Sequence, residues 1–272
     1  MRRLVHISDL HFGTTLPGIV PALLADLAAF QPDLVVVTGD VTQRARRSQF
    51  EEARRFLDAL PCQHLVVPGN HDIAPLYAPL SRLVDPYARY RRYIGPELES
   101  AYVDDRLLVL GMNTVEPLRI QEGSVSRRQL AWIRAEAARH PHHFRVLAAH
   151  HPLAPITLAH PGARVRRHRA LIDVLESAGV ELCLTGHLHQ SFSAPFLTAS
   201  GQGHSTLVVR ASTASSQRLR GHGNAYNRLL IDPPELALAV RAWDGERFTT
   251  SRVERFARSG RRWRPEAERL SG

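Results

Sequence analysis

Cysteine is scarce in this sequence of 272 residues, which contains only Cys62 and Cys183. Two cysteines exclude a disulfide-rich scaffold and a cysteine-rich zinc site, and this usage fits a reducing compartment. Each cysteine lies at or near an apolar run that is typical of a strand. We therefore expect both to pack as small hydrophobic side chains.

Long apolar segments are also absent. No stretch of about 18 apolar residues occurs, which predicts that the chain has no transmembrane helix. The first nine residues carry a basic pair after Met1 but lack the apolar core of a signal peptide. These absences lead us to expect a cytoplasmic protein.

Acidic residues are in deficit, because 26 Asp and Glu face 35 basic residues and the net charge is +9. This balance suits phosphate esters, nucleic acid or an acidic lipid surface, and composition does not choose among them. Several arginines crowd the C-terminus, where residues 259–272 are expected to form a basic tail. With 44% hydrophobic residues, residues 1–258 are expected to fold as one domain.

What the sequence does contain is a regular alternation of short apolar runs and amphipathic stretches. Strands are expected at residues 4–7, 34–37 and 65–67, with helices between them at 20–30 and 48–60. This βαβαβ order is typical of an α/β fold and predicts a parallel sheet with helices packed on it. Residues 75–100 hold four prolines and four tyrosines, and we expect a small helical cap or rim there.

The character of the chain changes near residue 190. Before that point, strands are expected at 101–103, 107–112, 146–149 and 182–184, and helices at 126–139 and 167–178. The helix at 126–139 begins with the capping-box spacing of Ser126 and Gln129. Beyond it only strands are expected, at 192–196, 206–210, 226–231 and 236–243. These strands predict a second, largely antiparallel sheet.

Polar side chains follow five of the expected strands. The five segments are Asp9-Leu10-His11, Gly39-Asp40, Gly69-Asn70-His71-Asp72, His150-His151-Pro152 and Gly186-His187-Leu188-His189. In open α/β sheets, ligands bind at the carboxyl ends of the strands. Oxygen and nitrogen donors of these types suit a divalent metal ion, so the sequence predicts a metal site at this edge.

The spacing within these segments supports the same prediction. In an extended chain, residues i and i+2 point the same way, so Asp9 and His11 can reach one site while Leu10 turns to the core. His187, Leu188 and His189 repeat this pattern. A single Gly-Asp or Asp-x-His segment is more often a plain turn, but all five segments in this order leave little room for a purely structural interpretation.

Together, the five segments resemble the signature of the calcineurin-like metallophosphoesterase superfamily. The resemblance covers the chain to about residue 245 and is strongest to the bacterial class III cyclic nucleotide phosphodiesterases. It implies a two-sheet β-sandwich flanked by helices and a metal-dependent phosphoric diester hydrolase. It also implies two metal ions, which we expect to be Mn²⁺, Fe²⁺ or Fe³⁺, with Zn²⁺ as an alternative.

The resemblance assigns a ligand set to each ion. One ion would be bound by Asp9, His11, Asp40 and His189. The other would be bound by Asp40, Asn70, His150 and His187, so that the Asp40 carboxylate bridges the pair. A hydroxide that bridges both ions would then attack the phosphorus atom.

Further residues receive catalytic or substrate-binding roles. His71 would stabilise the transition state or protonate the leaving alkoxide, and Asp72 would either orient a neighbour or cap a helix. His151 would lie behind the ligands or face the substrate. Asn113, Arg218 and Arg220 are expected to bind substrate, although a solvent-exposed loop is an equal alternative for both arginines.

A 3′,5′-cyclic nucleotide is the substrate that the resemblance favours. The chain departs from the family pattern at Asn113, where Asp is usual, and at Glu122, where His is frequent. The cap tyrosines have two alternative interpretations: they line a pocket for a base, or they pack as part of an ordinary helical cap. These residues are Tyr77, Tyr87, Tyr90 and Tyr93.

Three other functions stay open at this point. They are a lipid A precursor pyrophosphohydrolase, a nuclease, and an interaction scaffold with a disused metal site. Nucleic acid is possible as a partner but not favoured, because no basic and aromatic groove motif is present. A homodimer is also possible.

Overall fold

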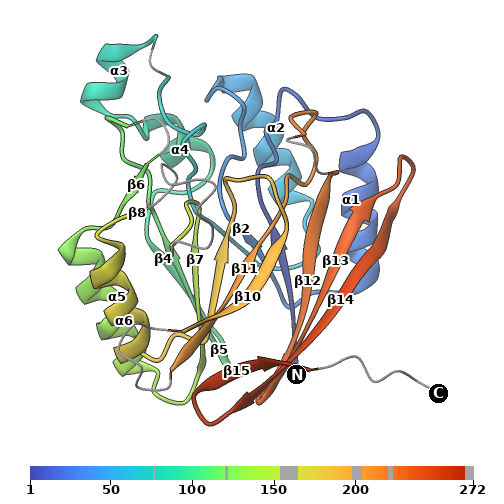
Figure 1. Ribbon diagram of the computed structural model, residues 1–272. Coiled ribbons are helices and arrows are strands. Elements are labelled where there is room, and N and C mark those ends of the chain that lie inside the picture. Colours follow the sequence, from blue (N-terminus) through green and yellow to red (C-terminus); the bar gives the residue numbers. More distant parts are fainter. Residues whose placement is uncertain (76, 120–121, 154–164, 198–203, 220–222, 267–272) are drawn as a thin grey trace.

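The computed structural model describes residues 1–75, 77–119, 122–153, 165–197, 204–219 and 223–266. Two β-sheets face each other and helices cover the outer face of each sheet (Figure 1). The predicted fold class, a two-sheet β-sandwich flanked by helices, is therefore confirmed.

The first sheet contains seven strands in the order β15-β14-β13-β12-β1-β2-β3. The parallel strands β1 (Arg2–Ile7), β2 (Leu34–Val37) and β3 (His64–Val66) alternate with α1 (Ile19–Phe30) and α2 (Arg47–Asp58). The predicted βαβαβ unit is thus confirmed. The branched run of β2 is fully buried, as expected for a strand covered on both faces.

The second sheet contains six strands in the order β10-β11-β9-β7-β5-β4. Its members are β4 (Ser100–Val103), β5 (Leu107–Met112), β7 (Phe144–Ala149), β9 (Leu182–Thr185), β10 (Phe192–Leu197) and β11 (Ser205–Arg210). The four central strands are parallel. Helices α5 (Arg127–Arg139) and α6 (His168–Ser177) cover its outer face, and Ser126 forms the predicted capping box with Gln129.

The prediction of a separate second sheet after residue 190 is wrong. Strands β10 and β11 complete the sheet that β9 belongs to, whereas β12 (Ala225–Asp232) and β13 (Glu235–Trp243) join the first sheet beside β1. Local alternation shows that a segment is a strand, but the partner of that strand depends on which sheet edge is free in the folded chain.

The C-terminal region also differs from the expected basic tail. Strand β14 (Phe248–Ser259) pairs with β13, and β15 (Arg262–Pro265) pairs with β14. Trp263 is buried, its ring lies 6.2 Å from that of Phe144, and its Nε1 donates to Glu181 O at 2.9 Å. The sequence did not predict β15 because arginines occupy its exposed positions and give the segment the composition of a tail.

The cap lies at the carboxyl edge of the sheets (Figure 1). It contains α3 (Pro79–Val84) and α4 (Ala88–Tyr93), while β6 (Gly123–Ser124) and β8 (Val165–Arg166) form a small parallel pair nearby. Tyr87 and Tyr90 are buried and Tyr77 is exposed, so the tyrosines do not frame a shared pocket.

One buried cluster lies between the two sheets, and two others lie under the helix pairs. Leu10 and Leu188 turn into the interior as predicted. Cys183 is buried and Cys62 is half-buried. Among the described residues, no helix is both long and apolar enough to cross a membrane.

Candidate metal centre

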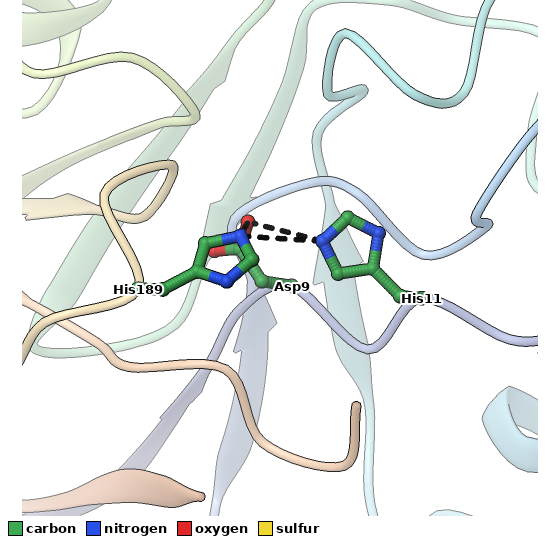
Figure 2. A group of neighbouring side chains, drawn as sticks. All are labelled: Asp9, His11 and His189. Atoms are coloured by element: carbon green, nitrogen blue, oxygen red, sulfur yellow. Dashed lines mark hydrogen bonds and ion pairs between the residues drawn. The ribbon is translucent and has the colours of Figure 1, made fainter. Parts of the chain in front are cut away.

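The five polar segments meet at the carboxyl ends of β1, β2, β3, β7 and β9. Two groups of side chains gather their ligand atoms within 4.8 Å, namely Asp9 with His11 and His189, and Asp9 with Asp40 and His150. Figure 2 shows the first group, in which the His11 and His189 imidazoles gather beside the Asp9 carboxylate. Residues that are far apart in the sequence thus form one compact centre.

In the first group, nitrogen and oxygen atoms face one another at close range. His11 Nε2 and His189 Nε2 are 3.3 Å apart. Asp9 Oδ1 lies 3.2 Å from His189 Nε2 and 3.7 Å from His11 Nε2. These atoms surround a point at which one ion would contact all of them.

The predicted ligands of the other ion form a further group, which has an amide in place of the carboxylate. Asn70 Oδ1, His150 Nε2 and His187 Nδ1 are each 3.1 Å from the other two. Asp40 Oδ2 lies 3.4 Å from His150 Nε2 and 3.8 Å from His11 Nε2. One oxygen of Asp40 therefore stands between the two groups, as a bridging ligand would.

Neighbouring groups orient these side chains and leave their inner atoms available. His150 Nδ1 donates to Thr38 O at 2.8 Å, and His189 Nδ1 donates to Arg218 O at 2.9 Å, so each ring directs Nε2 inward. Asp9 Oδ2 accepts from Ser8 Oγ and His187 N, whereas the buried Oδ1 has no hydrogen-bond partner among the described residues. A buried carboxylate oxygen without a partner, surrounded by imidazoles, fits a metal ion.

The backbone of the ligand segments is held in an uncommon conformation. Asp9, His11, Asp40, His187 and His189 all have positive φ angles, between 49° and 71°. Such angles cost about 1–3 kcal/mol each for residues with a side chain. Strain that recurs in five of the seven candidate ligands indicates that the fold holds them in position for binding.

Two glycines let these segments approach one another closely. A Cβ atom at Gly186 would lie 1.8 Å from Ser8 Oγ, and one at Gly69 would lie 2.2 Å from Asp40 Oδ1. Both positions therefore exclude every larger residue.

The electrostatics of the centre keep its carboxylates ionised. Burial opposes ionisation of Asp9 and Asp40, but the facing histidines outweigh it and hold both carboxyl pKa values below their usual range. Burial also disfavours charge on His150, yet Asp40 raises the pKa of that imidazole to about 9. Burial lowers the pKa of His11 to about 4. The ionised carboxylates supply the negative charge that cations require.

Comparison with known proteins agrees with this geometry. A model of the calcineurin-like phosphoesterase family matches residues 2–191. The chain belongs to this family. Members of the family use a dinuclear metal site, and this phosphoesterase has candidate ligands for one.

Among curated relatives, a probable cyclic nucleotide phosphodiesterase of Rhodococcus erythropolis is 28% identical over 71% of this chain and 66% of its own length. The glycerophosphodiester phosphodiesterase GpdQ of Enterobacter lignolyticus is 28% identical over 68% and 70%. The 3′,5′-cyclic adenosine monophosphate phosphodiesterase CpdA of Escherichia coli is 25% identical over 58% and 54%. The chain thus spans just under two thirds of the Rhodococcus relative.

Solved structures support the fold. Purple acid phosphatase PPD1 from yellow lupin (Lupinus luteus) superposes with a TM-score of 0.70 at 14% identity, over 96% of this chain and 54% of that chain. A dimetal phosphatase from Danio rerio gives 0.65 at 16% identity, over 92% and 98%.

In this phosphoesterase, His71 lies above the first ligand group and meets the His11 ring edge-on at 4.9 Å. Its Nδ1 donates to Gln43 O at 2.7 Å, so Nε2 accepts from Arg218 Nη1 at 3.1 Å. His71 and Arg218, which are 147 residues apart in sequence, therefore form one pair at the mouth of the centre. Substrate binding by Arg218 stays a prediction, and Arg220 lies outside the described residues.

Asp72 holds two loops together and does not cap a helix. Its buried carboxylate accepts hydrogen bonds from the backbone of Val41, Thr42 and Gly69 and from the Thr42 hydroxyl. Burial, together with the nearby charge of Asp40, raises the Asp72 pKa to about 6. The helix-cap alternative is wrong, because the chain turns after Asp72 and the next helix begins at Pro79.

The side chains of Asn113 and His151 both form hydrogen bonds with neighbouring protein groups. Asn113 Nδ2 donates to the Tyr87 hydroxyl at 3.0 Å, and its Oδ1 accepts from Val115 N at 2.9 Å. His151 is buried against the His150 and His187 rings, with Nδ1 on Thr114 Oγ1 at 2.9 Å. The ring contacts favour a supporting position behind the ligands for His151, whereas the partners of Asn113 belong to the cap and to the segment that follows β5.

Sequence reasoning missed Thr42 and Gln43, which support Asp72 and His71. The Thr42 hydroxyl donates to Asp72 Oδ1 at 2.9 Å and also lies 3.0 Å from His71 O. The only available signal was that both residues follow Gly39-Asp40 in a short polar turn.

Proposed function

We propose that this protein is a dinuclear-metal phosphodiesterase that hydrolyses a small phosphodiester, with a 3′,5′-cyclic nucleotide as the first candidate. The observation that carries the proposal is the position of Asp40 Oδ2, 3.4 Å from His150 Nε2 and 3.8 Å from His11 Nε2. A shared carboxylate between two complete ligand groups is the arrangement that two neighbouring cations require, since its charge offsets their repulsion.

Each group would supply one half of the centre. Asp9, His11 and His189 would hold one ion, Asn70, His150 and His187 the other, and Asp40 both. When bound, the ions activate water near neutral pH and neutralise charge on the phosphoryl oxygens. Mn²⁺ or Fe²⁺/Fe³⁺ suits this donor set, and Zn²⁺ is also compatible.

The pair formed by His71 and Arg218 would act on the substrate side of the centre. The guanidinium of Arg218 can donate two parallel hydrogen bonds to a phosphoryl group. When Arg218 turns to the phosphate, it releases His71 Nε2, which would take a proton from solvent and then donate that proton to the leaving oxygen. Gln43 O would keep the imidazole oriented through Nδ1.

The substrate proposal draws on the relatives, two of which are named for cyclic nucleotides and one for glycerophosphodiesters. A glycerophosphodiester is therefore the second candidate. The engagement of Asn113 by Tyr87 supports neither substrate directly, since it withdraws the amide from the site.

A lipid-linked pyrophosphate is a further alternative because three apolar residues of α3, Leu80, Leu83 and Val84, are about three-quarters exposed. A nuclease has no comparable feature in its favour. A scaffold is disfavoured because all seven candidate ligands are present and converge. A cytoplasmic location and a homodimer stay predictions.

A substrate panel tests the proposal. The protein would be stripped with chelator, reloaded with Mn²⁺ and assayed on cyclic nucleotides, glycerophosphodiesters, nucleoside pyrophosphates, single-stranded DNA and bis(p-nitrophenyl) phosphate. We expect the highest kcat/KM on a cyclic nucleotide. A higher kcat/KM on another substrate would reassign the specificity. Failure of Mn²⁺, Fe²⁺ and Zn²⁺ to restore any hydrolysis would refute the proposal that the protein is a metal-dependent phosphodiesterase.

A further inference from the structure

A cavity lined by positively charged side chains lies at the end of the sheets opposite the metal centre. A cavity of about 300 Å³ opens where β7 and β9 begin, next to the turn between β12 and β13. Its lining includes Arg145, Arg258, Arg261, His143, His204 and Glu181. None of these residues belongs to the candidate metal centre.

The charges around the cavity do not balance. Glu181 is the only acidic residue in its lining, and it faces three arginines. Both oxygens of Glu181 are already engaged, because Oε1 pairs with Arg258 and Oε2 accepts from the backbone N–H of Arg145 at 2.9 Å. Two formal positive charges therefore remain without a carboxylate in the lining.

One hydrogen-bond donor of this cluster is buried without a partner. Arg145 Nη2 donates to His140 O at 3.2 Å and Pro141 O at 2.6 Å, but its buried Nε has no acceptor among the described residues. Burial lowers the pKa of Arg145, and burial together with the charge of Arg145 lowers the pKa of Arg258. A buried donor without an acceptor and two guanidiniums that repel each other both favour binding of an anion.

His143 also lines the cavity. Its Nε2 donates to Asp104 O at 2.8 Å, and its buried Nδ1 has no partner within the described part of the chain.

A purely structural role explains only part of the cluster. Arg145 and Arg261 Nη2 both donate to backbone carbonyls near the ends of α5 and α6, as arginines at helix C-termini often do. This role leaves Arg145 Nε without an acceptor and does not account for the unbalanced charge. The chain contains no lysine, and the three permanently charged cations of the lining are all guanidiniums. A guanidinium is the group best shaped to bind two phosphate oxygens at once.

We infer that this cavity is a second anion site, which binds a phosphate-like dianion as free phosphate or as a small phosphomonoester. Its volume lies at the low end for small-molecule sites, which are about 300–1,000 Å³. The inference does not depend on the proposed hydrolysis, because the cavity shares no residue with the metal centre.

Calorimetric titration of the full chain with inorganic phosphate tests the inference, with chloride at equal ionic strength as the reference. Arg145→Gln and Arg261→Gln should each weaken binding at the cavity about tenfold, which is the loss expected for a charge-assisted hydrogen bond. Arg264→Gln, an exposed residue of β15 outside the cavity lining, is the matched control and should titrate as wild type.

Phosphate bound at the metal centre contributes equally to all four proteins, so the difference between variants isolates the cavity. A parallel titration with glycerol 3-phosphate distinguishes the ligand source, because a phosphomonoester that binds more tightly than phosphate must also use the cavity walls. Arg261 is exposed, so its variant should fold even if Arg145→Gln does not. Identical titrations of wild type and Arg261→Gln, or no phosphate binding in wild type, would overturn the inference.

Discussion

The candidate ligands and the residues above them are built in opposite ways. Six of the seven ligands are buried, and five have left-handed backbone angles held by hydrogen bonds between loops. The residues above the ligands include the hydrogen-bonded pair of His71 and Arg218, and helix α3, whose Leu80 and Leu83 are exposed to solvent. The rigid part of the molecule is therefore suited to hold ions, and the loosely packed part to select substrate.

The largest expected effect comes from the shared ligand. Asp40→Ala should lower kcat/KM on bis(p-nitrophenyl) phosphate at least about a thousandfold, which corresponds to roughly 4 kcal/mol, because both ion sites lose a carboxylate oxygen. Metal analysis should show less bound metal in parallel. Asp58→Ala, on the exposed face of α2, is the control and should keep full activity. A variant of Asp40 that retains its metal and activity would contradict the proposed centre.

A pair of glycine substitutions compares the packing of the two regions. Gly186→Ala places a Cβ atom 1.8 Å from Ser8 Oγ and should lower the free energy of unfolding by roughly 3 kcal/mol, as overpacking of a tight site does. Gly95→Ala in the cap meets no atom within 4 Å and should change that free energy by less than about 0.5 kcal/mol. Denaturant titration of both variants measures the two changes in the free energy of unfolding. Equal changes would show that the two regions do not differ in packing.

The free energy of unfolding should also depend on pH, because His6 is buried in β1 below the ligands. Burial lowers the pKa of His6 to about 3, against an ordinary value of 6.5. The unfolded chain then binds a proton that the folded chain excludes, so this stability is complete above pH 6.5 and is lost as pH falls toward 3. Between pH 7 and 5 the loss from His6 is about 2 kcal/mol.

Replacement of the titrating group isolates that contribution. His6→Asn should reduce the pH dependence of the unfolding free energy by about 2 kcal/mol over this range. Denaturant titrations of both proteins at pH 7 and 5 supply the four values required. An unchanged pH dependence would mean that His6 titrates normally in the folded protein.

The smallest effect is expected at the rim. Arg218→Gln should reduce kcat/KM about tenfold, since it removes one charge-assisted contact to phosphate while metal content and melting temperature stay the same. Arg255→Gln, exposed on β14, is the matched control. A loss of bound metal in the Arg218 variant would instead assign this residue to the support of His189, whose Nδ1 donates to its carbonyl oxygen.

The ligand segments could be predicted because their signal is local. Asp9 and His11, like His187 and His189, are two residues apart at the end of an apolar strand, and this spacing survives in any sheet that contains the strand. The order of the expected elements up to residue 190 was predictable for the same reason, since periodicity within each segment identifies it. Asn70 and Asp40 needed only the further rule that parallel strands end at the same edge.

Other features arise only from contacts between distant segments. Nothing near Arg218 in the sequence indicates that its guanidinium lies 3.1 Å from His71, and nothing near Asn113 indicates that Tyr87 engages its amide. Part of the charged run that was expected to be a tail, Arg262–Pro265, forms β15, because Trp263 is buried beside Phe144.

The sequence by itself determined the α/β class, the seven candidate ligands and the chemistry that their oxygen and nitrogen atoms favour. Only the tertiary structure decided which sheet the late strands join, how Asp40 stands between the two groups, and where Arg145, Arg258 and Arg261 gather. The physical reason is the range of the interactions: side-chain periodicity acts within a segment, whereas strand pairing and buried charge depend on which surfaces the folded chain brings together.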